Sequence, residues 1–177
     1  EQGAALAEEL DLGPGEYSIA TIHRAENTDD PKRLKAILES LGNVDHPVVI
    51  LAHPRLVAKA KEHGLEIDQG NLVSHESLPY AELVSAVMNS RGVITDSGGL
   101  QKEAFLLRVP CTTVRPETEW VETVDLGWNQ LVEPGETLTA AAARPRPEPT
   151  KAAPYGNGNA AQRVVRALEQ ATSADRT

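Results

Sequence analysis

Short apolar runs alternate with amphipathic stretches along most of this sequence. The runs short enough to be strands occupy residues 17–22, 47–52, 71–74, 92–95, 111–114 and 130–132. Such runs, separated by helical segments, are typical of βαβ units, in which parallel strands are covered by helices on both faces. The alternation therefore predicts an α/β fold, with a doubly wound, Rossmann-like parallel sheet of five or six strands.

The segments between the runs carry apolar residues at helical spacing. Residues 31–41, for example, place Leu34, Ile37 and Leu41 on one stripe, with Pro31 in the first turn, where its missing N–H does no harm. Helices are predicted at residues 1–12, 31–41, 55–63, 79–89, 97–107, 117–124 and 159–170. The helix at 1–12 is already under way at the first residue, so we expect the sequence to begin part-way through a longer protein.

Residues 143–153 are rich in Pro, Arg and Ala and show no period, which predicts a loop or linker. At 177 residues the chain is long enough for one domain with a core and too short for two of ordinary size. We therefore expect residues 1–177 to form one domain.

Charge and cysteine content narrow the function classes. The net charge of −9 disfavours nucleic acid and anionic membranes as partners, because both repel an acidic surface. Cys111 is the only cysteine, so no disulfide can form within the chain. No apolar run approaches the roughly 18 residues that span a bilayer, and no export signal opens the sequence, so we expect a cytoplasmic location. The scattered histidines lack the spacing of zinc ligands, and we expect neither a metal nor another cofactor.

The motif Thr95-Asp96-Ser97-Gly98-Gly99 stands where a predicted strand ends and a helix begins. Free N–H groups and the positive end of the helix dipole meet at such a junction, and glycines allow a phosphate to approach the backbone. The junction therefore suits a pyrophosphate. The plainer alternative is that Asp96 or Ser97 only caps the helix. Glu103, farther along this helix, could reach a ribose diol or could be a solvated helix residue.

Further polar clusters follow other strands at the same edge of the predicted sheet. His23, Arg24 and Glu26 follow the first strand, and His53 follows the second. In the plainer alternative, Arg24 only pairs with Glu26. Against that alternative, His23-Arg24 and His53-Pro54-Arg55 bring two His-Arg pairs to one crevice, which favours an anionic ligand. Arg115 follows a later strand, with Glu117 and Glu119 close behind it, although either carboxylate could be an ordinary charge at a helix start.

Taken in order, these clusters resemble the non-hydrolysing UDP-N-acetylglucosamine 2-epimerases. The matching pieces are His23-Arg24-Ala25-Glu26-Asn27, His53-Pro54, Thr95 to Ala104, Arg115 with Thr118-Glu119, and Pro154-Tyr155-Gly156-Asn157-Gly158. Each piece alone is weak, but the ordered set is specific and covers the chain from about residue 17 to residue 168.

The resemblance implies a role for each matching residue. His23 would contact the diphosphate and assist catalysis, and Glu103 would hold the ribose. Arg24 and His53 match positions that line a regulatory site for a second UDP-sugar in bacterial members. The remaining implied substrate contacts are Ser97, Gly98 and Gly99 for the phosphates, Leu78 and Leu83 for the uracil, and Arg115 and Glu119 beside them.

The family is similar to B-type glycosyltransferases, with two Rossmann-like halves and the substrate between them. This sequence corresponds to the second half, and the family's main acid-base carboxylates lie in the first. The resemblance thus implies a chain that binds UDP and a UDP-N-acetylhexosamine weakly, turns over nothing without the missing N-terminal domain, and belongs to a homodimer when that domain is present.

The sequence departs from the family pattern at Trp120, where many members have an arginine that would touch the nucleotide. This change puts that contact and the N-acetylglucosamine assignment in doubt. Asn157 replaces a common Asp but keeps an acceptor oxygen. The alternatives are a hydrolysing epimerase, a UDP-dependent glycosyltransferase of the same fold, and a non-catalytic UDP-sugar sensor.

Overall fold

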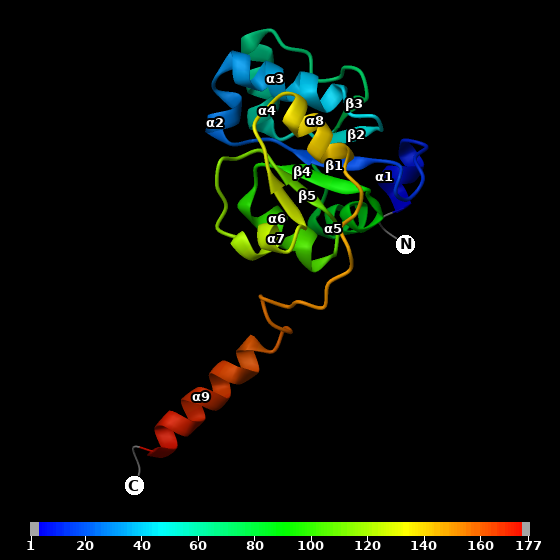
Figure 1. The fold of residues 1–177 in the computed structure, drawn as a ribbon. Coiled ribbons are helices and arrows are strands. Elements are labelled where there is room, and N and C mark those ends of the chain that lie inside the picture. The colour runs from blue at the N-terminus through cyan, green and yellow to red at the C-terminus, as the bar shows by residue number, and fades with distance from the viewer. Residues whose placement is uncertain (1–3, 175–177) are drawn as a thin grey trace. The chain divides into compact units, whose positions relative to one another are not determined.

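A computed structural model describes residues 4–174, and it contains one six-stranded parallel sheet (Figure 1). The strands are β1 (Ser18–Thr21), β2 (Val48–Leu51), β3 (Leu72–His75), β4 (Gly92–Thr95), β5 (Cys111–Thr113) and β6 (Asn129–Leu131). They lie in the order β3-β2-β1-β4-β5-β6, and every neighbouring pair is parallel. This is the strand order of a doubly wound, Rossmann-like sheet, which confirms the predicted fold class.

Most of the helices join successive strands, whereas α1 precedes β1, and α8 and α9 follow β6. They are α1 (Ala4–Glu9), α2 (Ala25–Thr28), α3 (Pro31–Gly42), α4 (Pro54–His63), α5 (Tyr80–Asn89), α6 (Gly98–Leu106), α7 (Val121–Asp125), α8 (Glu136–Ala143) and α9 (Ala160–Ala174). The helix predicted at 1–12 corresponds to α1, and residues 1–3 lie outside the described part of the chain.

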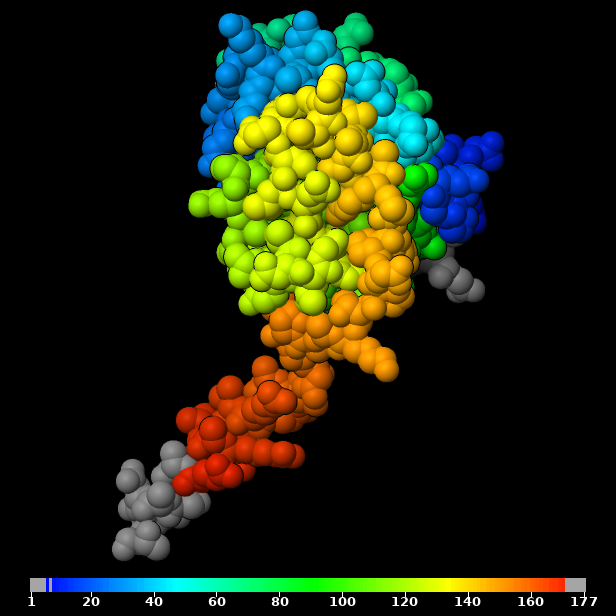
Figure 2. All heavy atoms as spheres, in the orientation of Figure 1, coloured from blue at the N-terminus to red at the C-terminus, as the bar shows by residue number. Residues whose placement is uncertain are grey.

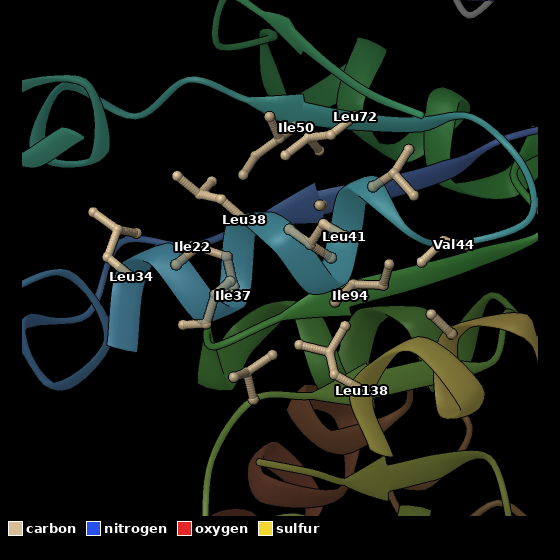
Figure 3. Close-up of a cluster of buried hydrophobic side chains, with 14 of the residues drawn as sticks. Ile22, Leu34, Ile37, Leu38, Leu41, Val44, Ile50, Leu72, Ile94 and Leu138 are labelled. Atoms are coloured by element: carbon tan, nitrogen blue, oxygen red, sulfur yellow. The ribbon is translucent and has the colours of Figure 1, made fainter. Parts of the chain in front are cut away.

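Each face of the sheet has its own apolar core. On one face, Leu38 of α3, Leu56 of α4 and Leu138 of α8 pack with the strands, and all three are fully buried. Figure 3 shows Leu38 and Leu138 in this cluster. On the other face, α1, α5 and α6 supply the covering side chains. The space-filling view shows α8, in yellow and orange, on the surface of the first of these faces (Figure 2). Burial on both faces explains why β2 reads as an uninterrupted apolar run.

The sheet reverses its winding between β1 and β4. These two strands are neighbours although the β2 and β3 units separate them in sequence, and Thr21 lies opposite Thr95 at their carboxyl ends. Ligands of doubly wound folds bind in the crevice that opens at such a reversal. The chain segments after Thr21 and Thr95 therefore define the place to look for a site.

Three helical segments differ from the prediction, and the first is the short helix α2, which was not expected. The helix expected at 117–124 is shorter and begins at Val121, because Thr118 Oγ1 accepts a hydrogen bond from the Trp120 amide (3.0 Å) in an open loop. Helix α8 was not expected, since its alanine run has no apolar stripe. Alanine has the highest intrinsic helix propensity, and the buried Leu138 and Ala141 anchor the helix to the sheet.

The chain divides into two compact units, Glu1–Pro147 and Glu148–Thr177. The second unit contains residues 148–153 of the segment predicted as a linker and the amphipathic helix α9, whereas Ala143, the first residue of the predicted linker, ends α8 in the first unit. Val164, Val165 and Leu168 of α9 are each more than half exposed. Among the described residues, no helix is long and apolar enough to cross a membrane.

Candidate functional site

Asp96, the first residue after β4, organises the loop that follows β1. Its side chain is fully buried and accepts hydrogen bonds from the backbone N–H groups of His23 (3.1 Å) and Arg24 (2.9 Å) and from Asn27 Nδ2 (3.0 Å). Its Oδ1 also lies 3.0 Å from His23 Nδ1. One carboxylate therefore joins the two segments at the switch point and fixes the His23 ring.

This contact changes how both groups titrate. The hydrogen bond to Asp96 raises the pKa of His23, against the opposing effects of burial and of the Arg24 charge. Burial alone would raise the pKa of Asp96, but the hydrogen bonds from His23, Asn27 and Arg24 outweigh it and hold that pKa below its ordinary value. The pair therefore favours a protonated imidazole beside an ionised carboxylate.

A cavity of about 330 Å³, here called the His23 cavity, opens beside this pair. It brings together most of the residues that the sequence singled out, from the segments that follow β1, β2, β3 and β4 and from helices α5 and α6. Those lining residues are His23, His53, Leu78, Leu83, Ser97, Gly99 and Glu103. Polar groups line one part of the cavity, and Leu78 and Leu83 give another part an apolar wall, a combination that suits a small molecule with a flat ring and charged groups.

The amino-terminal turn of α6 borders the His23 cavity. Ser97 is the N-cap residue, and its side chain makes no capping hydrogen bond. A side chain at Gly99 would meet no atom within 4 Å, so this glycine leaves the helix start open. The Ser97 amide is not among the free donors, because it donates to Thr95 Oγ1 (2.9 Å). The anion-binding capacity of the turn therefore lies with the Ser97 hydroxyl and the amides that follow it.

Glu103 faces the same cavity and has a partner that the sequence did not single out. Tyr80 lines the cavity, is 66% exposed, and donates a hydrogen bond from its hydroxyl to Glu103 Oε1 (3.3 Å). The Glu103 charge raises the pKa of Tyr80. An aromatic residue in the first turn of the helix predicted at residues 79–89 is the signal that could have identified Tyr80.

Arg24 and Arg115 line a different cavity of about 450 Å³, together with Glu26, Asn27, Arg33, Val114, Pro116, Glu117 and Glu133. We call it the arginine cavity. Arg24 and His53, which the resemblance assigns to one regulatory site, thus border separate cavities, although the His53 ring lies 5.2 Å from the His23 ring.

Glu119 connects the arginine cavity to α6. Its Oε2 accepts a hydrogen bond from Arg115 Nη1 (3.0 Å), and its other oxygen lies where a side chain on Gly98 would be. A side chain at Gly98 would therefore require the Glu119 carboxylate to move. The expected contact residues Gly98, Arg115 and Glu119 form one group beside the His23 cavity.

Trp120 stabilises the same turn. Its indole Nε1 donates to the Gly98 carbonyl oxygen (2.7 Å), and Lys102 Nζ lies 4.8 Å from the ring centroid. The residue that departs from the family pattern thus holds the backbone of α6 in place. Within residues 4–174, no group of His, Cys, Asp and Glu side chains could hold a metal ion.

The comparisons with known proteins identify the family. The family model described as UDP-N-acetylglucosamine 2-epimerase matches residues 2–169. The chain belongs to the UDP-N-acetylglucosamine 2-epimerase family. The resemblance drawn from the ordered motifs is therefore confirmed.

Relatives of this epimerase-family chain include enzymes with different named substrates. It is 39% identical over 158 residues to the UDP-2,3-diacetamido-2,3-dideoxy-D-glucuronate 2-epimerase of Pseudomonas aeruginosa, covering 86% of this chain and 44% of that protein. It is 35% identical over 162 residues to the UDP-N-acetylglucosamine 2-epimerase of Methanocaldococcus jannaschii, covering 86% and 44%. The chain thus spans about half the length of these relatives.

A solved structure gives the same result. The Methanocaldococcus jannaschii UDP-GlcNAc 2-epimerase in complex with UDP-GlcNAc and UDP superposes with a TM-score of 0.81 at 32% identity, covering 96% of this epimerase-family chain and 49% of that one.

Proposed function

We propose that this chain is the UDP-binding half of a UDP-N-acetylglucosamine 2-epimerase of the non-hydrolysing type. The observation that carries the proposal is the His23 cavity, where a histidine, the open start of α6, a carboxylate and an apolar wall meet at the switch point of the sheet. The family membership and a relative's complex with UDP-GlcNAc and UDP support it.

In this proposal each part of the cavity binds one part of the nucleotide. Leu78 and Leu83 frame the uracil, and Glu103 accepts hydrogen bonds from the ribose hydroxyls. The diphosphate lies at the Ser97 turn, where helix amides stabilise its charge. His23, whose protonated form is favoured by the contact with Asp96, donates to the diphosphate on the side of the sugar.

The proposed reaction proceeds by elimination and addition. A base removes the proton from C2, the bond from C1 to the UDP oxygen breaks, and a C1–C2 double bond forms. UDP then adds back to C1, and a proton is delivered to C2 on the opposite face. Protonated His23 stabilises the departing diphosphate, and the acid and base at C2 are carboxylates of the half of the relatives that this chain does not match.

Binding of UDP to the chain tests the nucleotide site. Calorimetry is expected to give a dissociation constant between micromolar and millimolar, roughly −4 to −8 kcal/mol. Ser97→Trp, which fills the turn, is expected to abolish the signal. Ala140→Trp, at an exposed position of α8 that lines neither cavity, is the control and is expected to retain it. No heat at millimolar UDP, or equal binding by Ser97→Trp, would contradict the site.

Product analysis tests the reaction type. The chain alone is expected to leave UDP-N-acetylglucosamine unchanged, whereas a longer protein that contains it also forms UDP-N-acetylmannosamine. His23→Ala is expected to lower the turnover of that longer protein by about two orders of magnitude. Release of free N-acetylmannosamine would instead assign a hydrolysing epimerase.

A second candidate substrate has a specific observation in its favour. The Pseudomonas aeruginosa relative, 39% identical, is named for a UDP-diacetamido-glucuronate, a sugar nucleotide with a carboxylate at C6. The same elimination and addition at C1 and C2 would serve this substrate, because C6 takes no part in the bond changes.

A further inference from the structure

Each arginine of the arginine cavity pairs with a more exposed glutamate. The side chains of Arg115, Arg33 and Arg24 are 10%, 26% and 37% exposed. Their partners are Glu119 (46% exposed), Glu133 (57%) and Glu26 (70%). Because exposed ion pairs are weak, these carboxylates neutralise the arginines only partly. The cavity therefore offers cations to a group that enters it.

The position of Glu119 indicates that a carboxylate fits beside Arg115 and Arg24. Its pKa is lowered first by the hydrogen bond from its own amide and then by Arg115, and the charge of Arg24 acts in the same direction. A carboxylate thus already lies near two guanidinium groups, pressed against Gly98. The Glu119 side chain is 46% exposed, so an entering carboxylate can replace it and send it into solvent.

The arginine cavity also adjoins the proposed nucleotide site. His23 and Arg24 are consecutive residues, and both bond to Asp96, through His23 Nδ1 (3.0 Å) and the Arg24 amide (2.9 Å). His23 lines one cavity and Arg24 lines the other. A ligand whose diphosphate lies beside Ser97 and His23 would therefore carry its sugar to the boundary with the arginine cavity.

We propose that the arginine cavity binds a carboxylate on the sugar of the UDP-sugar, through Arg24 and Arg115, with displacement of Glu119. This inference rests on the proposed function and narrows its substrate class to UDP-hexuronates. Guanidinium groups recognise carboxylates through paired, charge-assisted hydrogen bonds, which a neutral hydroxymethyl group at C6 cannot match.

Two ligands that differ only at C6 test the proposal. UDP-N-acetylglucosaminuronate carries a carboxylate where UDP-N-acetylglucosamine carries a hydroxymethyl group. We expect calorimetry on the chain to give about tenfold tighter binding of the uronate, the size of one added charge-assisted hydrogen bond. Equal dissociation constants for the two ligands would overturn the proposal.

Variants that remove one arginine charge test which residues cause the tighter binding of the uronate. Arg24→Gln and Arg115→Gln are each expected to reduce the ratio of the two dissociation constants to near one. Arg91→Gln removes the same charge just before β4, at the amino-terminal edge of the sheet, and is expected to keep the ratio. Should Arg115→Gln fail to fold because Arg115 is buried, Arg24→Gln decides the matter, and a full preference in that variant overturns the proposal.

UDP and free glucuronate separate the remaining outcomes. If UDP itself does not bind, the proposed function fails, whereas UDP binding with equal affinity for both sugar nucleotides refutes only the carboxylate site. Free glucuronate added to the UDP-saturated chain is expected to bind far more weakly than the linked group, because the linkage supplies a high effective concentration. Tight binding of free glucuronate would assign the cavity to a separate effector and overturn the proposal.

Discussion

Asp96 holds His23 by both its side chain and its backbone. The carboxylate lies 3.0 Å from the imidazole Nδ1 and accepts the His23 amide as well (3.1 Å). Because Asp96 follows β4 and His23 follows β1, this contact joins the two strands at which the sheet reverses. The position and the protonation of His23 therefore depend on a residue that is distant in sequence.

Removing the Asp96 charge is expected to lower the pKa of His23, since that contact is the main cause of its raised value. The measurement is a titration of the imidazole resonances by NMR in Asp96→Asn and in the unaltered chain. Asp125→Asn, an exposed aspartate in α7, is the matched control and is expected to leave the His23 titration as it is. An unchanged His23 pKa in Asp96→Asn would show that the contact does not govern the imidazole.

The same pair predicts how stability depends on pH. The pKa of His23 is raised on folding, so its stabilising effect is complete below the ordinary value near 6.5 and is lost as the pH rises through the folded value. Asp96 has a lowered pKa, so its contribution is lost only as the pH falls through a value below 3.8.

Urea unfolding of the chain and of His23→Gln across pH 5 to 9 measures the first effect. We expect the difference in free energy of unfolding to be largest at pH 5 and to shrink toward pH 9. A difference that stays constant over this range would refute a charged His23–Asp96 pair.

Gly99 provides a test that separates binding from folding. Because a side chain there meets no atom within 4 Å, Gly99→Leu is expected to fold, with a stability within about 1 kcal/mol of the unaltered chain or higher. The added side chain would lie at the start of α6 and is expected to weaken UDP binding at least tenfold. Ala58→Leu, at an exposed position of α4, is the control for an added apolar side chain. Unchanged UDP affinity in Gly99→Leu would place the diphosphate elsewhere.

Tyr80 is expected to position Glu103 for the ribose. Tyr80→Phe removes the hydrogen bond to Glu103 Oε1 while keeping the ring. Calorimetry with UDP and with 2′-deoxy-UDP measures how strongly the site reads the ribose hydroxyl. We expect Tyr80→Phe to reduce the preference for UDP by about threefold, in keeping with the loss of one modest hydrogen bond. If the preference is unchanged, Tyr80 only covers the cavity.

The sequence predicted the strands and the larger helices because burial on both faces makes β2 uniformly apolar and gives α3 a clear stripe. It also placed His23, Ser97 and Glu103 at one edge, since the carboxyl ends of parallel strands share that edge. It did not assign Asp96 its role, because an aspartate before a helix is equally compatible with capping, and only the strand order brings it to His23. Nor could the sequence show that Arg24 and His53 line different cavities, because the direction of each side chain is set only in the folded loop.

The most direct test of the UDP site is an NMR titration of the isotope-labelled chain with UDP. The account predicts saturable shifts of the Gly98, Gly99 and Leu100 amides together with the His23 imidazole, at one dissociation constant. Shifts confined to other regions, or none at millimolar UDP, would contradict the claim that the start of α6 and His23 bind the diphosphate together.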